Sequence, residues 1–175
     1  MKTQNIKPKT PSSWEFQQLA EASFDAANAA YADCQARDAR FAAGSKGDET
    51  TFMSITVVFL YFRAIELSLK AAIVERHLAP PAKIPSRELG HDLKKLIACA
   101  TTPTVDTPAY SLADLGLNDE DKAYIERYSD DYANKWFEYN FGPWKIPCLQ
   151  QSQRIANQIL SAIKPIARTL PQFTL

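Results

Sequence analysis

The chain has 175 residues, of which 46% are hydrophobic and 23% charged, values typical of one globular domain with its own core. Lysine plus arginine and aspartate plus glutamate both number 20, so no net charge draws the protein to nucleic acid or an anionic membrane, and nucleic-acid binding would need a local basic patch. The cysteines (Cys34, Cys99 and Cys148) lack disulfide or zinc-ligand spacing, which predicts buried free thiols in a reducing, cytoplasmic protein without metal or cofactor.

The N-terminal region contains a polar segment and then a long helix. Residues 1–11 contain no apolar run of the kind that a signal peptide requires, and we expect a flexible tail there, followed by a single domain over 12–175. Ser12 and Glu15 have the spacing of a capping box, in which the two side chains bind free amides at a helix start. Apolar residues at helical spacing follow as far as about Phe41, so the first helix is predicted to end there.

The second predicted helix, over about 50–78, is the most apolar part of the chain, and two prolines at 80 and 81 end it. Its apolar stretch is interrupted by Arg63, Glu66 and Lys70. A bilayer would penalise these charges heavily, so the pattern predicts a core helix rather than a membrane span.

Two more helices are predicted after this core helix. The third, which is short, follows residues 90–92 and ends before Pro103. After a loop over 102–117, Asn118 and the carboxylates that follow it form a strong helix start, because the asparagine can cap and the negative charges suit the positive end of the helix dipole. This fourth helix is expected to reach about Tyr132.

The C-terminal part combines an aromatic-rich connection over 133–147 with a last helix from about Pro147 to Leu170, which Pro165 should kink or end early. The sequence contains neither an internal repeat nor a second domain. The five helices together predict an all-α fold, an antiparallel, up-and-down helical bundle.

Four polar residues of the second helix lie on one face, since Arg63, Glu66, Lys70 and His77 fall within about 60° of one another on a helical wheel. Almost all of the remaining circumference is apolar, so the stripe faces either a narrow window to solvent or a polar cleft. In the first case Glu66 forms ordinary ion pairs with Lys70 and Arg63. In the second, the charges form a partly buried, fully hydrogen-bonded cluster that serves orientation, an interface or an anionic ligand.

Three segments resemble, in order, motifs of the HEPN family (higher eukaryote and prokaryote nucleotide-binding domains). Residues 62–71 (FRAIELSLKA) are similar to the family's AxExxLKA helix, and residues 90–96 (GHDLKKL) to its GHDLxxL helix start. Residues 124–130 (YIERYSD) resemble YxxxRYPD, with Ser129 in place of the proline. The resemblance implies a HEPN-like helical bundle, frequent homodimers, and functions on RNA or nucleotides as metal-independent ribonucleases, toxins or partners of nucleotidyltransferases.

The stripe and the resemblance together select the expected ligand-binding residues: Arg63, Glu66, Lys70, His91, Arg127 and Tyr128. Ribonucleases of the family carry an arginine and a histidine separated by four to six residues. Here Arg87 and His91 are separated by three, so the signature is missing and these two residues are only candidates for catalysis. His91 has a structural alternative, in which it caps the helix entrance or pairs with a carboxylate such as Glu66.

Three functions remain open on the sequence. The first is binding of RNA or a nucleotide-like anion, or partnership with a nucleic-acid-processing protein, without robust nuclease activity. The second is a metal-independent ribonuclease with the shortened Arg87–His91 motif. The third is a non-enzymatic module that dimerises through the aromatic segment 132–144, which could instead plug the bundle end or stack on bases.

Overall fold

A computed structural model describes residues 11–41, 49–84, 89–135 and 147–163. These ranges contain five α-helices and two 3-10 turns but no strand, so the predicted all-helical fold is confirmed. The α-helices are α1 (Ser13–Phe41), α2 (Glu49–Glu75), α3 (Leu93–Thr101), α4 (Asp119–Ala133) and α6 (Leu149–Ile163), and the 3-10 turns are η1 (Pro81–Lys83) and η2 (Ala113–Leu115).

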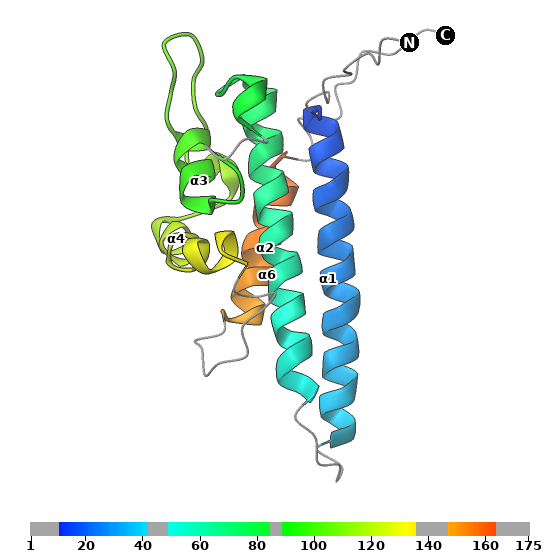
Figure 1. The fold of residues 1–175 in the computed structure, drawn as a ribbon. Coiled ribbons are helices and arrows are strands. Elements are labelled where there is room, and N and C mark those ends of the chain that lie inside the picture. The colour runs from blue at the N-terminus through cyan, green and yellow to red at the C-terminus, as the bar shows by residue number, and fades with distance from the viewer. Residues whose placement is uncertain (1–10, 42–48, 85–88, 136–146, 164–175) are drawn as a thin grey trace, which may run out of the picture.

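The long helices α1 and α2 run antiparallel along the length of the molecule, and α6 lies beside them (Figure 1). The shorter helices α3 and α4 pack against each other on one side of α2, with α4 lying across the long axis. The helix α2 therefore has neighbours on most of its circumference, as its apolar composition requires.

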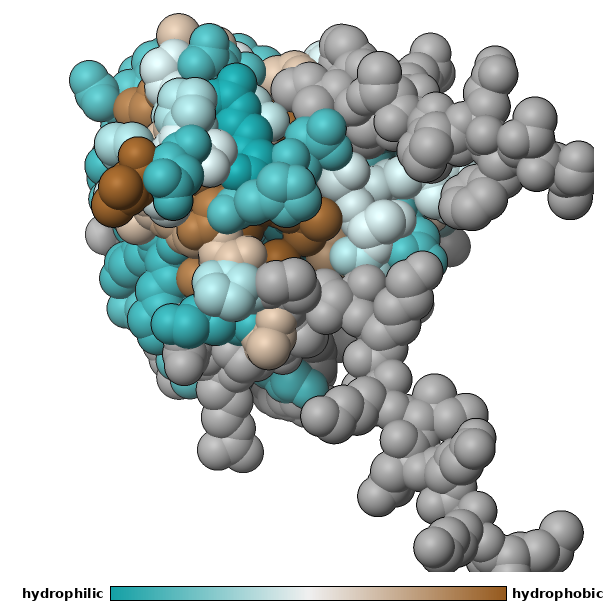
Figure 2. Space-filling view, turned by 90° about the horizontal axis from the view of Figure 1, so that it is seen from above, coloured by the Kyte–Doolittle hydropathy of each residue, from teal (hydrophilic) through white to brown (hydrophobic). Residues whose placement is uncertain are grey.

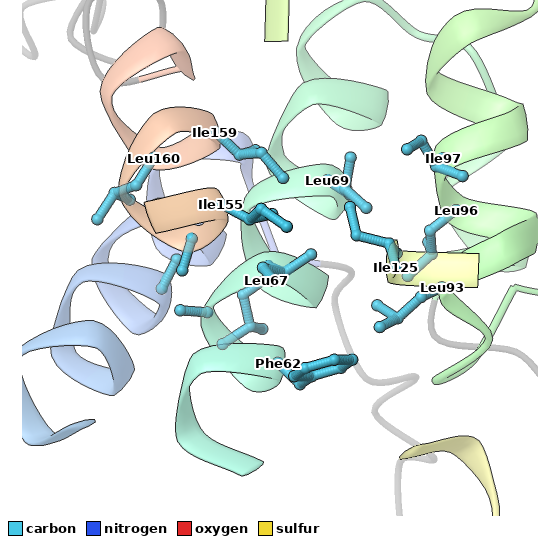
Figure 3. Packing of buried hydrophobic residues seen from close by; sticks show 14 of the residues in the cluster. Phe62, Leu67, Leu69, Leu93, Leu96, Ile97, Ile125, Ile155, Ile159 and Leu160 are labelled. Carbon is cyan, nitrogen blue, oxygen red and sulfur yellow. The ribbon is translucent and has the colours of Figure 1, made fainter. Parts of the chain in front are cut away.

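The core is built around α2 (Figure 3). Phe62 and Leu69 of this helix point toward α3 and α4, where they meet the side chains of Leu93, Leu96 and Ile125. On another side α6 contributes Ile155 and Ile159, and all of these side chains are fully buried. Truncating one such leucine or isoleucine to alanine typically costs about 2–5 kcal/mol, so this packing fixes the direction in which the polar face of α2 points.

Capping residues define two helix starts as the sequence predicts. Ser12 and Glu15 form the expected capping box before α1, where the Glu15 backbone N–H donates to Ser12 Oγ at 3.2 Å and the Ser12 N–H donates to the Glu15 carboxylate at 2.6 Å. Asn118 forms a second capping box with Asp121 at the start of α4.

The end of α2 differs from the prediction and removes His77 from the predicted stripe. The helix ends at Glu75, and the chain then folds back so that the Leu78 N–H donates to the Ile73 carbonyl at 3.0 Å and the His77 N–H to the Val74 carbonyl at 3.2 Å. This pair of bonds is a Schellman motif, which requires a left-handed residue, and His77 supplies it with a φ of 52°. The buried Leu78 side chain completes the motif and His77 is left exposed.

Seen from above, the surface of the described residues is mostly hydrophilic, with hydrophobic residues gathered near its middle (Figure 2). Of the helices in the described ranges, none combines the length and the apolar composition that crossing a bilayer requires. The three cysteines are free, but only Cys34 is buried; Cys99 is half-buried and Cys148 is exposed, so the prediction of three buried thiols is wrong. Cys148 lies just before α6 begins.

Several predictions concern residues outside the described ranges. These are the tail as far as residue 10, the aromatic residues from Trp136 to Trp144, the C-terminal end of the last helix with Pro165, and Arg87.

Candidate functional site

The carboxylate of Glu66, in the middle of α2, is fully buried and accepts hydrogen bonds from four side chains. Arg63 Nη1 donates to both of its oxygens, at 2.9 and 2.8 Å, and Lys70 Nζ donates to Oε1 at 2.6 Å. The Tyr132 hydroxyl donates to Oε2 at 2.5 Å, and Nδ1 of His91 lies 3.0 Å from the same oxygen. We call these five residues the Glu66 cluster.

Three parts of the chain position the Glu66 cluster. Arg63, Glu66 and Lys70 share one face of α2 because they are spaced three and four residues apart. Gly90, with a φ of 43°, allows the turn that carries His91 toward α2, and this φ favours glycine because it has no Cβ. Tyr132 comes from the last turn of α4.

A second set of polar contacts fixes α3 against α4 beside the cluster. Asp92 caps α3 by accepting the backbone N–H of Lys95 at 3.2 Å. Ser129 of α4 is buried; its hydroxyl donates to Asp92 Oδ1 at 3.2 Å and accepts from the Lys94 backbone N–H at 3.0 Å. Ser129 is the residue that replaces the proline of the family motif, and a proline could not make these bonds. These contacts hold His91 and Tyr132 on the same carboxylate.

The electrostatics of the Glu66 cluster keep its carboxylate ionised. Burial alone opposes this charge, but the Lys70 and Arg63 cations outweigh burial and hold the pKa of Glu66 below its usual value. Burial and the Glu66 charge together raise the pKa of Tyr132, which keeps its proton and remains a donor. For Arg63 the effect of burial is exceeded by that of Glu66, and the pKa is raised. Two cations thus surround one anion, and the cluster has an excess of one positive charge.

The geometry around His91 defines its tautomer when the ring is neutral. A carboxylate oxygen can only accept, so Nδ1 must carry the hydrogen that bonds to Glu66 at 3.0 Å. Arg63 Nη1 lies 3.5 Å from Nδ1, and this longer contact joins two donors rather than a donor and an acceptor. The ring nitrogen Nε2 is therefore left as the acceptor, oriented by a buried carboxylate through the other nitrogen.

Only two members of the Glu66 cluster have substantial access to solvent. The side chain of His91 is 53% exposed and that of Arg63 is 34% exposed, whereas Lys70 is 7% exposed. Arg63 uses Nη1 alone for both bonds to Glu66, so its other nitrogens are not committed to the carboxylate. A ligand would meet a guanidinium and an imidazole above a buried excess charge.

The structure brings together four of the six residues expected to bind a ligand, namely Arg63, Glu66, Lys70 and His91, and it confirms the predicted contacts of Glu66 with the other three. Tyr128 packs instead on the rings of Phe62 and Tyr124, at centroid distances of 6.2 and 5.1 Å. Arg127 is exposed and turned away from the buried face of α4, and within the described ranges it makes no hydrogen bond or ion pair with the cluster. Arg87, the other catalytic candidate, lies outside those ranges.

Sequence reasoning missed Tyr132 as a member of the cluster. Its position on the buried face of α4 follows from the spacing Tyr124, Tyr128, Tyr132, and a buried tyrosine hydroxyl normally has a hydrogen-bond partner. The signal was therefore present, but identifying Glu66 as the acceptor requires the packing of α4 on α2. A half-buried neighbour, Phe59, was also overlooked; its ring lies 5.7 Å from that of Tyr132.

The described residues contain no group of three or more His, Cys, Asp or Glu side chains that could hold a metal ion. Comparison of the chain with protein-family models, curated proteins and solved structures finds no match. The HEPN resemblance therefore stays a prediction, as do the homodimer and the nucleotidyltransferase partner that it implies.

Proposed function

We propose that the protein binds RNA or a nucleotide-like anion at the Glu66 cluster, through Arg63 and His91. One observation carries this proposal: two cations and a histidine surround a single buried carboxylate, and the two members that reach solvent are a guanidinium that can donate to an anion and an imidazole whose Nε2 can accept from a hydroxyl group. A guanidinium binds phosphate oxygens through several N–H groups in a fixed plane. Robust nuclease activity is not part of the proposal.

The remaining members have supporting roles in this proposal. Lys70 is too deeply buried to meet a ligand and supplies positive charge from beneath. Glu66 and Tyr132 hold Arg63 and His91 in place, because both oxygens of the carboxylate are shared among donors from three parts of the chain. The carboxylate of Glu66 neutralises one of the two cations, and a ligand phosphate would neutralise the other.

The test is a salt-dependent titration of single-stranded RNA with the wild-type protein and Arg63→Gln. We expect the variant to bind at least about 10-fold more weakly, and the slope of log affinity against log salt to fall by about 0.7, the value for one lost single-strand phosphate contact. Arg154→Gln is the matched control, since it removes the same charge from an arginine that also pairs with a buried carboxylate. Equal affinities for wild type and Arg63→Gln would refute the proposal.

A second candidate, a metal-independent ribonuclease, is favoured by the geometry of His91. With Nδ1 bonded to Glu66, Nε2 could take the proton of a ribose 2′-hydroxyl, while the guanidinium of Arg63 holds the adjacent phosphate. Arg63 would then fill the place that the sequence suggested for Arg87. The expected result is RNA cleavage in EDTA that His91→Ala abolishes. Absence of cleavage across diverse RNAs would exclude this candidate and leave binding in place.

A further inference from the structure

An aromatic side chain continues the polar face of α2 toward the start of the helix. Phe59 precedes Arg63 by four residues and Glu66 by seven, a spacing that puts all three on one side of the helix. The Phe59 ring is partly exposed and rests on Tyr132, with 5.7 Å between centroids and an interplanar angle of 38°. The hydroxyl group of Tyr132 donates to Glu66, so Phe59 packs on a ring that is held in place.

We propose that the ligand of the Glu66 cluster is single-stranded RNA, with one base stacked on Phe59, the adjoining phosphate bound by Arg63, and a ribose hydroxyl donating to Nε2 of His91. This inference rests on the proposed function and adds the class of ligand. Residues four apart on a helix are separated by about 6 Å along its axis, which is about the length of the ribose between a base and its phosphate. An aromatic ring beside a cation is the usual combination in sites for single strands.

The same geometry disfavours two other ligands of similar charge. In a double helix the bases are paired and stacked on each other, so none is available to Phe59. A bare anion such as pyrophosphate would use Arg63 but has no base for the aromatic ring and no ribose hydroxyl for His91. Single-stranded RNA should therefore bind more tightly than either.

The experiment uses the full chain and four probes: a labelled single-stranded RNA, the same strand without bases, the corresponding duplex, and pyrophosphate. The variant is Phe59→Leu, which keeps an apolar side chain against Tyr132 but removes the aromatic face. We expect it to weaken binding of the single strand by about 10-fold and to leave binding of the abasic strand and of pyrophosphate unchanged. Phe59→Trp should bind the single strand at least as tightly as wild type.

Control variants separate failure of this inference from failure of the proposed function. Phe24→Leu removes a partly buried aromatic residue that packs on Tyr61 of the same bundle, away from the Glu66 cluster, and should change nothing. If Arg63→Gln weakens all probes while Phe59→Leu weakens none, stacking on Phe59 is refuted and anion binding stands. If the wild type binds none of the probes, or Arg63→Gln has no effect on any, the proposed function fails and this inference fails with it. Circular dichroism of each variant checks that the fold is intact.

Discussion

Two carboxylates are buried in the part of the chain that the structure describes, Glu66 in the middle of α2 and Asp121 at the start of α4. Asp121 pairs with one cation, Arg154, at 2.5 and 3.3 Å, and it also accepts the Asn118 backbone N–H at the helix cap. Its charge is balanced, and the pair fastens α4 to α6. Glu66 has two cations and a histidine as partners, and they leave positive charge in excess.

The comparison shows that burial of a carboxylate does not by itself indicate a site. The Asp121–Arg154 pair has a full structural explanation as a helix cap and an interhelix link. A link of that kind at Glu66 would need one cation. A structural link does not require the additional cation, the oriented imidazole or the exposure of Arg63 and His91. For this reason we propose the ligand site at Glu66 and not at Asp121.

The largest expected effect is the loss in the free energy of unfolding when Glu66 is neutralised. Glu66→Gln leaves Lys70 buried without its counter-ion, and the loss of one partner of a buried ion pair typically costs about 3–5 kcal/mol. Urea denaturation followed by circular dichroism measures the free energy of unfolding. A loss below about 1 kcal/mol would mean that Lys70 is effectively hydrated and that the cluster is not a buried ionic unit.

A smaller loss is expected for Tyr132→Phe, which removes only the hydroxyl that donates to Glu66. A hydrogen bond to a charged group contributes about 1.5–3 kcal/mol, so the free energy of unfolding should fall by that amount. The matched control is Tyr128→Phe, in which the ring packing on Phe62 is kept and Glu66 loses no donor. Equal effects of the two substitutions would contradict the role given to the Tyr132 hydroxyl.

Arg154→Gln should cost less, because the side chain of Arg154 is 46% exposed and solvent screens the pair. We expect a loss of about 1 kcal/mol or less in the free energy of unfolding, and unchanged binding of single-stranded RNA. Arg63→Gln, by contrast, should weaken the binding of single-stranded RNA. If Arg154→Gln impaired RNA binding as much as Arg63→Gln, the distinction between a link and a site would be lost.

The smallest effect concerns pH. The pKa of Glu66 is held below the usual 4.5, so its ion pairs contribute fully above about pH 4.5, and the contribution is lost as the pH falls through the lowered value. Glu66→Gln has no such group. Unfolding free energies measured between neutral pH and pH 4 should therefore begin to converge for the two proteins at the acidic end. Curves that stay parallel down to the acid unfolding of wild type would contradict the ionised state of Glu66 in the fold.

Much of the fold was predictable because local chemistry determines it. The capping residues at Ser12 and Asn118 set helix starts, and the charges of α2 fall on one face through spacing alone. The partners from other elements were harder to predict, since Tyr132 joins the cluster only through the way α4 crosses α2. Arg127 shows the reverse error, because the motif suggested a role whereas the helical face turns this residue outward. His77 was misplaced because a Schellman motif ends α2 early without a glycine.

The most direct test of the central claim is ¹⁵N NMR of the two histidine side chains, His77 and His91, at about pH 8, where an ordinary imidazole is neutral. We predict that His91 carries its hydrogen on Nδ1, and that single-stranded RNA shifts the Nε2 resonance of His91 but not the resonances of His77, which is exposed at the end of α2. A hydrogen on Nε2 of His91 in the free protein, or a His91 signal that saturating RNA leaves unmoved, would contradict the site proposed at Glu66.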